Sequence, residues 1–289
     1  MDAGSFQGVS GLKVFTRSWR PVTTEPRGAI VVVHGFNSHS GYYEWAAKQF
    51  VAHGLSVHAL DLQGRGKSEG ERFYIERFED YVANVATFVT IVKSRESEIP
   101  VFLLGHSAGG VVCCLYALEH QTELAGLICE SFAHELPAPD VALAILRGLG
   151  HIAPHAHVLK LKNEDFSRDP KVVEAMNHDP LIANETQPIQ TVAALVRADE
   201  RLKKGFSRIT LPLLILHGRS DNAAKPSGSQ HFHEMAGSND KTLLLYEGYF
   251  HDLLNDLGRE NVMADVQRWI DDRTTTSAAS RGSKHRESL

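Results

Sequence analysis

The chain has 289 residues, 43% of them hydrophobic, which is enough for one large α/β domain or for a core domain with an inserted subdomain. Its formal net charge of −5 and its pI near 6.3 argue against nucleic acid or an anionic membrane surface as the main partner. The three cysteines fit neither a disulfide framework nor a metal site, and neither a secretory leader nor a long apolar span is visible. We therefore expect a cytoplasmic protein that binds no metal and needs no cofactor.

The first part of the chain alternates predicted strands with predicted helices. Residues 12–19 alternate apolar and polar side chains, as an exposed antiparallel strand does, and residues 29–34 form an apolar run typical of a strand covered on both faces. The elements predicted next are a helix over 42–53, a strand over 55–60, a helix over 78–93, a strand ending at Gly105, a helix after Ser107 and a strand over 124–130. This order predicts a mostly parallel, doubly wound sheet with helices on both faces.

Residues 132–207 interrupt the alternation. They contain no β-branched strand run, prolines break the pattern, and the apolar stretches 141–149 and 192–196 have helical spacing. We therefore predict a helical cap, or lid, inserted over 132–207, with the apolar stretch 141–149 covering the site.

The sheet pattern resumes after the cap. Strands are predicted over 211–217 and 241–246, and an amphipathic helix over 259–272. Residues 1–131 and 208–273 would thus form one α/β core. Residues 274–289 are dominated by Ser, Thr, Arg and Lys, so we expect a disordered tail there.

The stretch from Gly105 to Gly109, Gly-His-Ser-Ala-Gly, is the strongest functional signal. It joins a predicted buried strand to a predicted helix with almost no residue between them, so Ser107 must occupy a tight, strained turn that exposes its Oγ. A Gly-x-Ser-x-Gly motif by itself also occurs in ordinary turns. The strand before it and the helix after it favour a nucleophile at Ser107.

A serine nucleophile needs a base, and the base needs an acid to orient it. In a doubly wound sheet both should come from loops at the carboxyl ends of strands. Asp221 lies four residues beyond the strand that ends at His217, and His251 lies five beyond the strand that ends at Tyr246. The order Ser, Asp, His is the order of this architecture. We interpret His217, His231 and His233 as structural or solvated.

The oxyanion formed during acyl transfer requires fixed N–H donors. We expect one from the backbone of Ala108, the residue after the nucleophile, and one from Phe36, where Gly35 would let the backbone turn inward. The alternative for Gly35 is a simple loop glycine. We expect Asp61 to bind backbone amides, and we interpret His151, His155 and His157 as lacking the spacing of a metal site.

Several motifs together resemble one family. They are His34-Gly35 with His39-Ser40-Gly41 downstream, residues 61–70 in the pattern D-x-x-G-x-G-x-S-x-G, residues 105–110, Asp179-Pro180-Leu181, Leu216-His217-Gly218 followed by Asp221, and Tyr246-Glu247-Gly248 followed by His251. Over residues 12–272 the chain is similar to the monoacylglycerol lipase and lysophospholipase branch of the α/β-hydrolases. The resemblance implies an α/β-hydrolase fold, a triad of Ser107, Asp221 and His251, and an oxyanion hole formed by Phe36 and Ala108.

The chain departs from that family at a few positions. Asn37, Ser38 and Tyr42 stand where the family usually has Gly, Glu and Arg, and Leu254 stands where some members have a second histidine. Ser38, Tyr42 and Leu254 supply less charge than the Glu, Arg and His of the family, so esters of apolar alcohols are expected to react at least as well as a monoacylglycerol of matched acyl length.

We expect a serine carboxylester hydrolase that forms an acyl-enzyme on Ser107. Its substrates would be amphipathic or apolar esters such as monoacylglycerols, lysophospholipids or short-chain esters. Two alternatives stay open: a catalytically silent binding protein of the same fold, and a hydrolase of C–C or amide bonds with the same triad. A transient contact of the cap with a membrane and the oligomeric state are also left open by the sequence.

Overall fold

The structure, a computed structural model, describes residues 1–96, 98–134 and 152–284, with the backbone alone for 275–284. The strands of its main sheet are β1 (Asp2–Gln7), β2 (Lys13–Trp19), β3 (Ala29–Val33), β4 (Ser56–Leu60), β5 (Val101–His106), β6 (Gly126–Glu130), β9 (Leu213–Gly218) and β10 (Lys241–Tyr246). The α-helices are α1 (Glu44–Ala52), α2 (Phe78–Arg95), α3 (Ala108–His120), α5 (Pro170–His178), α6 (Ile189–Gly205), α7 (Pro226–Met235) and α8 (Arg259–Lys284).

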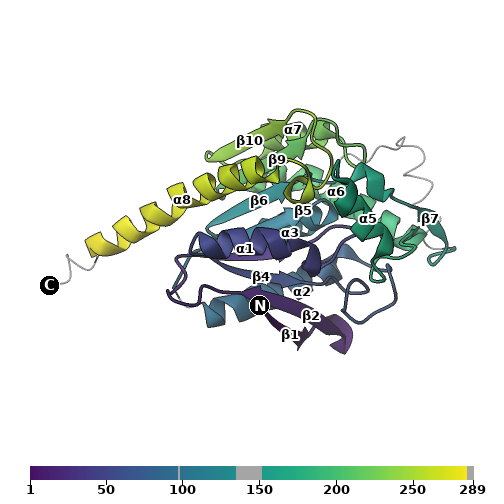
Figure 1. Cartoon of the computed structure of the whole chain (residues 1–289), viewed down its shortest axis with the longest axis horizontal. Helices are drawn as coiled ribbons and strands as arrows, with labels where there is room; N and C mark the ends of the chain where they lie inside the picture. The colour runs from purple at the N-terminus through teal and green to yellow at the C-terminus, as the bar shows by residue number, and fades with distance from the viewer. Residues whose placement is uncertain (97, 135–151, 285–289) are drawn as a thin grey trace.

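One eight-stranded sheet forms the centre of the molecule, in the order β1-β2-β4-β3-β5-β6-β9-β10, with helices on both sides (Figure 1). All strands from β4 onward in this order pair in parallel, whereas β1 with β2 and β2 with β4 pair antiparallel. The predicted fold class, a mostly parallel sheet wound on both faces, is confirmed. The carboxyl ends of the parallel strands therefore share one edge, where loops from distant parts of the chain meet.

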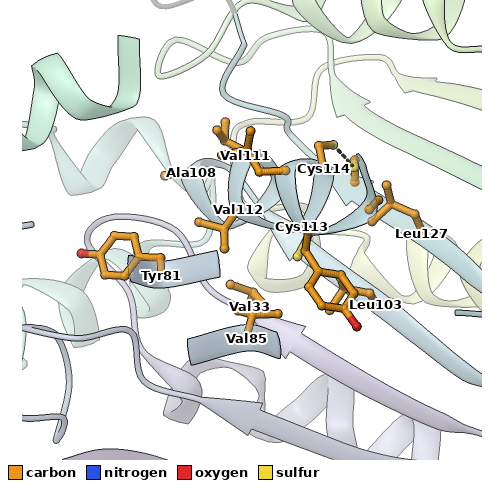
Figure 2. Packing of buried hydrophobic residues seen from close by; sticks show 14 of the residues in the cluster. Val33, Tyr81, Val85, Leu103, Ala108, Val111, Val112, Cys113, Cys114 and Leu127 are labelled. Atoms are coloured by element: carbon orange, nitrogen blue, oxygen red, sulfur yellow. Dashed lines mark hydrogen bonds between the residues drawn. The ribbon is translucent and has the colours of Figure 1, made fainter. Parts of the chain in front are cut away.

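Each central strand is buried on both faces because its side chains alternate between two cores. In β3, Val31 and Val33 face the core formed with α2, α3, α6 and α7, while Ile30 and Val32 face the core formed with α1 and α8. Figure 2 shows α3 packed in the first of these cores, with Val112 close to Val33 of the sheet and Val85 of α2. The helix that follows Ser107 is thus buried from Ala108 to Leu118.

The predicted cap region contains α5, α6 and a small two-stranded antiparallel sheet of β7 (His157–Leu159) and β8 (Gln187–Pro188). Sequence analysis predicted no strand here, because pairs this short leave no periodic pattern. The apolar stretch 141–149, predicted to cover the site, lies outside the described residues. Figure 1 shows α5 and β7 at one end of the molecule and α8 extending from the opposite end. The division into core and cap remains a prediction.

Both ends of the chain differ from expectation. Strand β1 was not predicted, because its residues are almost all exposed; backbone pairing with β2 and the packing of Phe6 on Phe88 hold it in place. The predicted disordered tail from Thr274 is instead helical through Lys284, as a continuation of α8. Thr274 itself is buried, and its hydroxyl accepts a hydrogen bond of 2.8 Å from Arg27, which anchors the helix there. Within the described residues, none of the helices is both long and apolar enough to span a membrane.

Candidate active site

Ser107 is the single residue between β5 and α3, and its backbone has an unfavourable conformation that the surrounding structure must stabilise. Its φ of 54° and ψ of −121° lie in a region that costs a non-glycine residue about 1–3 kcal/mol. The strand reaches His106, one residue beyond the predicted end, which leaves even less room for the turn. The amide of Ser107 donates to the carbonyl of Glu130 in β6 at 2.9 Å, so the neighbouring strand fixes the turn.

Glycines surround this turn because the backbone segments approach too closely for a side chain. A Cβ on Gly35 would lie 2.8 Å from the Cβ of Ser107, and a Cβ on Gly109 would lie 2.2 Å from the carbonyl oxygen of Val33. Gly35 was expected to permit a backbone turn, but its φ is not positive, and the positive φ of 49° belongs to Asn37. Close approach to Ser107 is therefore the reason for glycine at position 35.

Asp221 and His251, predicted from their places after two different strands, lie together. His251 Nδ1 is 2.7 Å from Asp221 Oδ2, and both side chains are almost completely buried. The other oxygen of Asp221 accepts hydrogen bonds from the amides of Ala223 and Ala224 at 2.7 and 2.9 Å. His251 Nε2 has no hydrogen-bond partner among the described residues.

His217 is part of the same group, which sequence analysis did not foresee. Its Nε2 lies 2.9 Å from Asp221 Oδ2, and its Nδ1 lies 2.7 Å from the hydroxyl of Ser229 in α7. Burial alone would raise the pKa of Asp221, but the charge of His251 and hydrogen bonds from both histidines outweigh it and hold that pKa well below its usual range. Asp221 is therefore a carboxylate at any pH at which the protein would work.

His251 lies beside the nucleophile turn and packs against a residue of the predicted cap region. The ring of His106, which precedes Ser107, is 4.8 Å from the ring of His251, centroid to centroid. Phe166 packs edge-on against His251 at 5.0 Å, and its carbonyl accepts a 2.8 Å hydrogen bond from the amide of Asp252. The imidazole is thus enclosed by apolar surface on the side of the cap.

The backbone amides of Phe36 and Ala108 are both available to an oxyanion. Neither N–H donates to an acceptor among the described residues. The loop that carries Phe36 is held by His34, whose Nδ1 lies 2.7 Å from the carbonyl of Gly35 and whose Nε2 accepts from the amide of Leu62 at 2.9 Å. Burial lowers the pKa of His34 to about 4, so it stays neutral and can accept this bond.

Asp61 joins two loops at this edge, as the sequence predicted. Its carboxylate accepts from the amide of Ser40 at 2.8 Å and from the amide of Lys67 at 2.7 Å. Of the histidines considered for a metal, His155 contacts Glu71 and His157 contacts Thr186, while His151 lies outside the described residues.

A buried ion pair, also missed by sequence analysis, ties the Phe36 loop to the cap. Arg65 is fully buried, its guanidinium lies 4.1 Å from the ring centroid of Phe36, and it binds Glu185 and Gln187 of the cap. Glu185 Oε1 also accepts from the amide of Asn37 at 3.0 Å. Arg65 and Glu185 lie 120 positions apart in the chain. No pattern of spacing in the sequence therefore links them.

Known proteins resemble this chain in sequence and in structure. A profile of the family described as "Serine aminopeptidase, S33" matches residues 24–258. The monoacylglycerol lipase of Mycolicibacterium smegmatis is 33% identical over 269 residues, 92% of this chain and 95% of that protein. Human monoglyceride lipase is 32% identical over 281 residues, 96% of this chain and 92% of that protein.

Among solved structures, the monoacylglycerol lipase of Paleococcus ferrophilus superposes with a TM-score of 0.81 at 26% identity, covering 90% of this chain and 99% of that one. A soluble variant of the Saccharomyces cerevisiae monoglyceride lipase, solved with a substrate analog, has a TM-score of 0.83 at 22% identity and covers 94% of each chain, which supports the fold alone. The family resemblance read from the motifs is confirmed. The chain belongs to the S33 serine aminopeptidase family of α/β-hydrolases, in the branch that includes the monoacylglycerol lipases.

Proposed function

We propose that this protein is a serine ester hydrolase that cleaves monoesters of polar alcohols, monoacylglycerols foremost, through an acyl-enzyme on Ser107. The observation that carries the proposal is the strained turn at Ser107 beside a buried His251–Asp221 pair, in which His251 Nε2 has no hydrogen-bond partner among the described residues. The names of the related lipases also indicate lipid esters as substrates of those proteins.

In the first half of the reaction, His251 Nε2 accepts the proton of the Ser107 hydroxyl as Oγ attacks the carbonyl carbon of the ester. The negative charge that develops on the carbonyl oxygen is stabilised by the N–H groups of Phe36 and Ala108. The intermediate then collapses, and His251 returns the proton to the leaving alcohol. Water repeats the sequence on the acyl-enzyme and releases the carboxylic acid. Asp221 holds His251 in the tautomer that leaves Nε2 unprotonated.

The structure weakens the expectation that apolar alcohols are preferred. Leu254, one of the residues behind that expectation, is buried in the core on the α1 side, and the hydroxyl of Tyr42 donates to Asp179 at 2.9 Å. Beside the Phe36 loop, Asn37 Oδ1 and Glu185 Oε2 are buried acceptors without a donor among the described residues. A hydroxyl-bearing alcohol could satisfy such acceptors, which supports a glycerol-type leaving group.

Two measurements test the proposal. A fluorophosphonate should add its mass to the peptide that contains Ser107, and Ser107→Ala should abolish both labelling and ester hydrolysis. Monomeric substrates of matched acyl length, a monoacylglycerol and an ester of an apolar alcohol, should then differ in kcat/KM by more than about tenfold, or roughly 1.4 kcal/mol, in favour of the glycerol ester. Labelling at another residue, or faster hydrolysis of an aminoacyl anilide than of any ester, would contradict the proposal.

The cytoplasmic location and a transient contact of the cap with a membrane remain proposals that rest on composition and on the lipid substrate class. A cell-fractionation experiment and sedimentation with lipid vesicles would test them.

A further inference from the structure

Glu130, the last residue of β6, binds both of the segments that carry the proposed catalytic groups. Its backbone carbonyl accepts the amide of Ser107 at 2.9 Å, and its side-chain Oε1 accepts the amide of Leu254 at 3.0 Å. Leu254 belongs to the short turn that directly follows His251. A single residue therefore connects the nucleophile turn to the histidine loop.

The side chain of Glu130 lies in a closed cluster with a second carboxyl group. Oxygens of Glu130 and Asp252 and a ring nitrogen of His106 lie within 4.8 Å of one another, and all three residues are buried. Within the described parts of the chain, no Lys or Arg forms an ion pair with either carboxyl group. The titratable groups that face the pair from the surrounding elements are His106, Tyr42, Tyr43, Tyr246, His251 and Asp256, the last of which is paired with Arg168.

Two ionised carboxylates cannot share a buried site without a cation, because each loses its hydration and repels the other. Asp252 has the better environment for the negative charge, since the amide of Asn255 donates to its two oxygens at 3.1 and 3.0 Å and the imidazole of His251 is close. Glu130 Oε2 is buried and has no hydrogen-bond partner among the described residues, so this oxygen is the atom that would hold a proton. Burial and the charge of Asp252 accordingly raise the pKa of Glu130 well above its usual range.

We propose that Glu130 is a positioning residue that acts as a neutral carboxylic acid, shares one proton with Asp252, and holds the His251 loop against the Ser107 turn. The proposal rests on the proposed function for its catalytic meaning, but the protonation of the pair does not depend on that function. Ionisation of Glu130 would place two repelling charges at the base of the loop. Alkaline pH should therefore loosen the loop and lower kcat before it unfolds the protein.

The sign of the effect on stability follows from proton linkage. A carboxyl group with a raised pKa binds more protons in the folded state than in the unfolded state, so its contribution is complete at low pH and declines as the pH rises above about 4.3. Over that range the ratio of the unfolding constants of wild type and Glu130→Gln should rise about tenfold per pH unit. Glu247→Gln is a matched control, because the side chain of Glu247 is 87% exposed.

Infrared spectroscopy gives a direct readout in the intact protein. At neutral pH the wild type and Glu247→Gln should show the C=O stretch of a protonated carboxyl group, which Glu130→Gln should lack. In the wild type the band should disappear as the pH is raised. The kinetic readout is the alkaline limb of kcat: Glu130→Gln, which keeps a carbonyl acceptor for Leu254, should lose this limb and retain at least about tenfold more kcat than Glu130→Ala.

Absence of the carboxylic acid band, together with a pH-independent ratio of unfolding constants, would overturn the proposal. One equivalent of a divalent metal in the purified protein, lost in Glu130→Gln, would also overturn it, because a metal rather than a proton would then balance the charges. If the band is present but Ser107 cannot be labelled, the shared proton stands and the proposed function fails.

Discussion

Replacing Gly35 by Ala tests whether the spacing between the oxyanion loop and the nucleophile turn matters. The new Cβ would lie 2.8 Å from the Cβ of Ser107 and 3.0 Å from the carbonyl oxygen of His106. Two carbon atoms normally approach to about 3.5–4.0 Å, so one segment must move by about 0.7–1.2 Å. Overpacking of this kind costs about 1–3 kcal/mol of stability. A displacement of about 1 Å between reacting groups costs about 100-fold in rate.

The assay is kcat for a soluble ester, measured beside the free energy of unfolding in urea. Gly35→Ala should lose about 100-fold in kcat, because the oxyanion donor of the Phe36 loop would be displaced from the Ser107 turn. Gly4→Ala is the control: its Cβ would meet only Thr16 Oγ1 at 3.3 Å, in an edge strand. Wild-type kcat in a folded Gly35→Ala protein would refute the argument that close approach to Ser107 explains this glycine.

Three further predictions concern the triad and the buried ion pair. Asp221→Asn should lower kcat by about 10⁴-fold. It should also reduce the loss of stability in acid, because the lowered pKa of Asp221 contributes stability that is present above about pH 4 and lost as the pH falls. Urea unfolding at several pH values measures this change in stability. Ser107→Ala combined with His251→Ala should be little worse in kcat than either change alone, and additive losses would show that the residues do not act as a unit. Glu185→Gln should cost about 3–5 kcal/mol in urea unfolding because it strands the buried charge of Arg65, and adding Arg65→Met should recover part of that loss.

The nucleophile turn could be predicted from sequence because it is local. Gly105, Ser107 and Gly109 are close in the chain, and the strand before them and the helix after them each leave a periodic apolar pattern. Asp221 and His251 could be predicted from a topological rule, since the carboxyl ends of parallel strands share one edge. Neither inference depends on which side chains are in contact.

The remaining parts of the site depend on contacts that no local pattern records. The pairs Arg65–Glu185 and Glu130–Asp252 join segments more than 100 residues apart, and each side chain alone is a common surface type. The sequence analysis interpreted His217 as structural or solvated, because its contact with Asp221 arises only in the folded chain. Their positions follow from how the loops pack over the sheet edge.

At both ends of the chain, too, tertiary contacts decide structure that local sequence patterns do not predict. Strand β1 has no apolar alternation, and it exists because β2 offers an unpaired backbone edge. The helix α8 passes the predicted boundary because Thr274 is buried against Arg27. The sequence by itself determined the parallel strands of the main sheet and most of the helices around it, and it predicted the three residues of the proposed triad, since these depend on periodicity and chain order. Only the tertiary structure decided which buried charges face one another, because burial and proximity are properties of the packed chain.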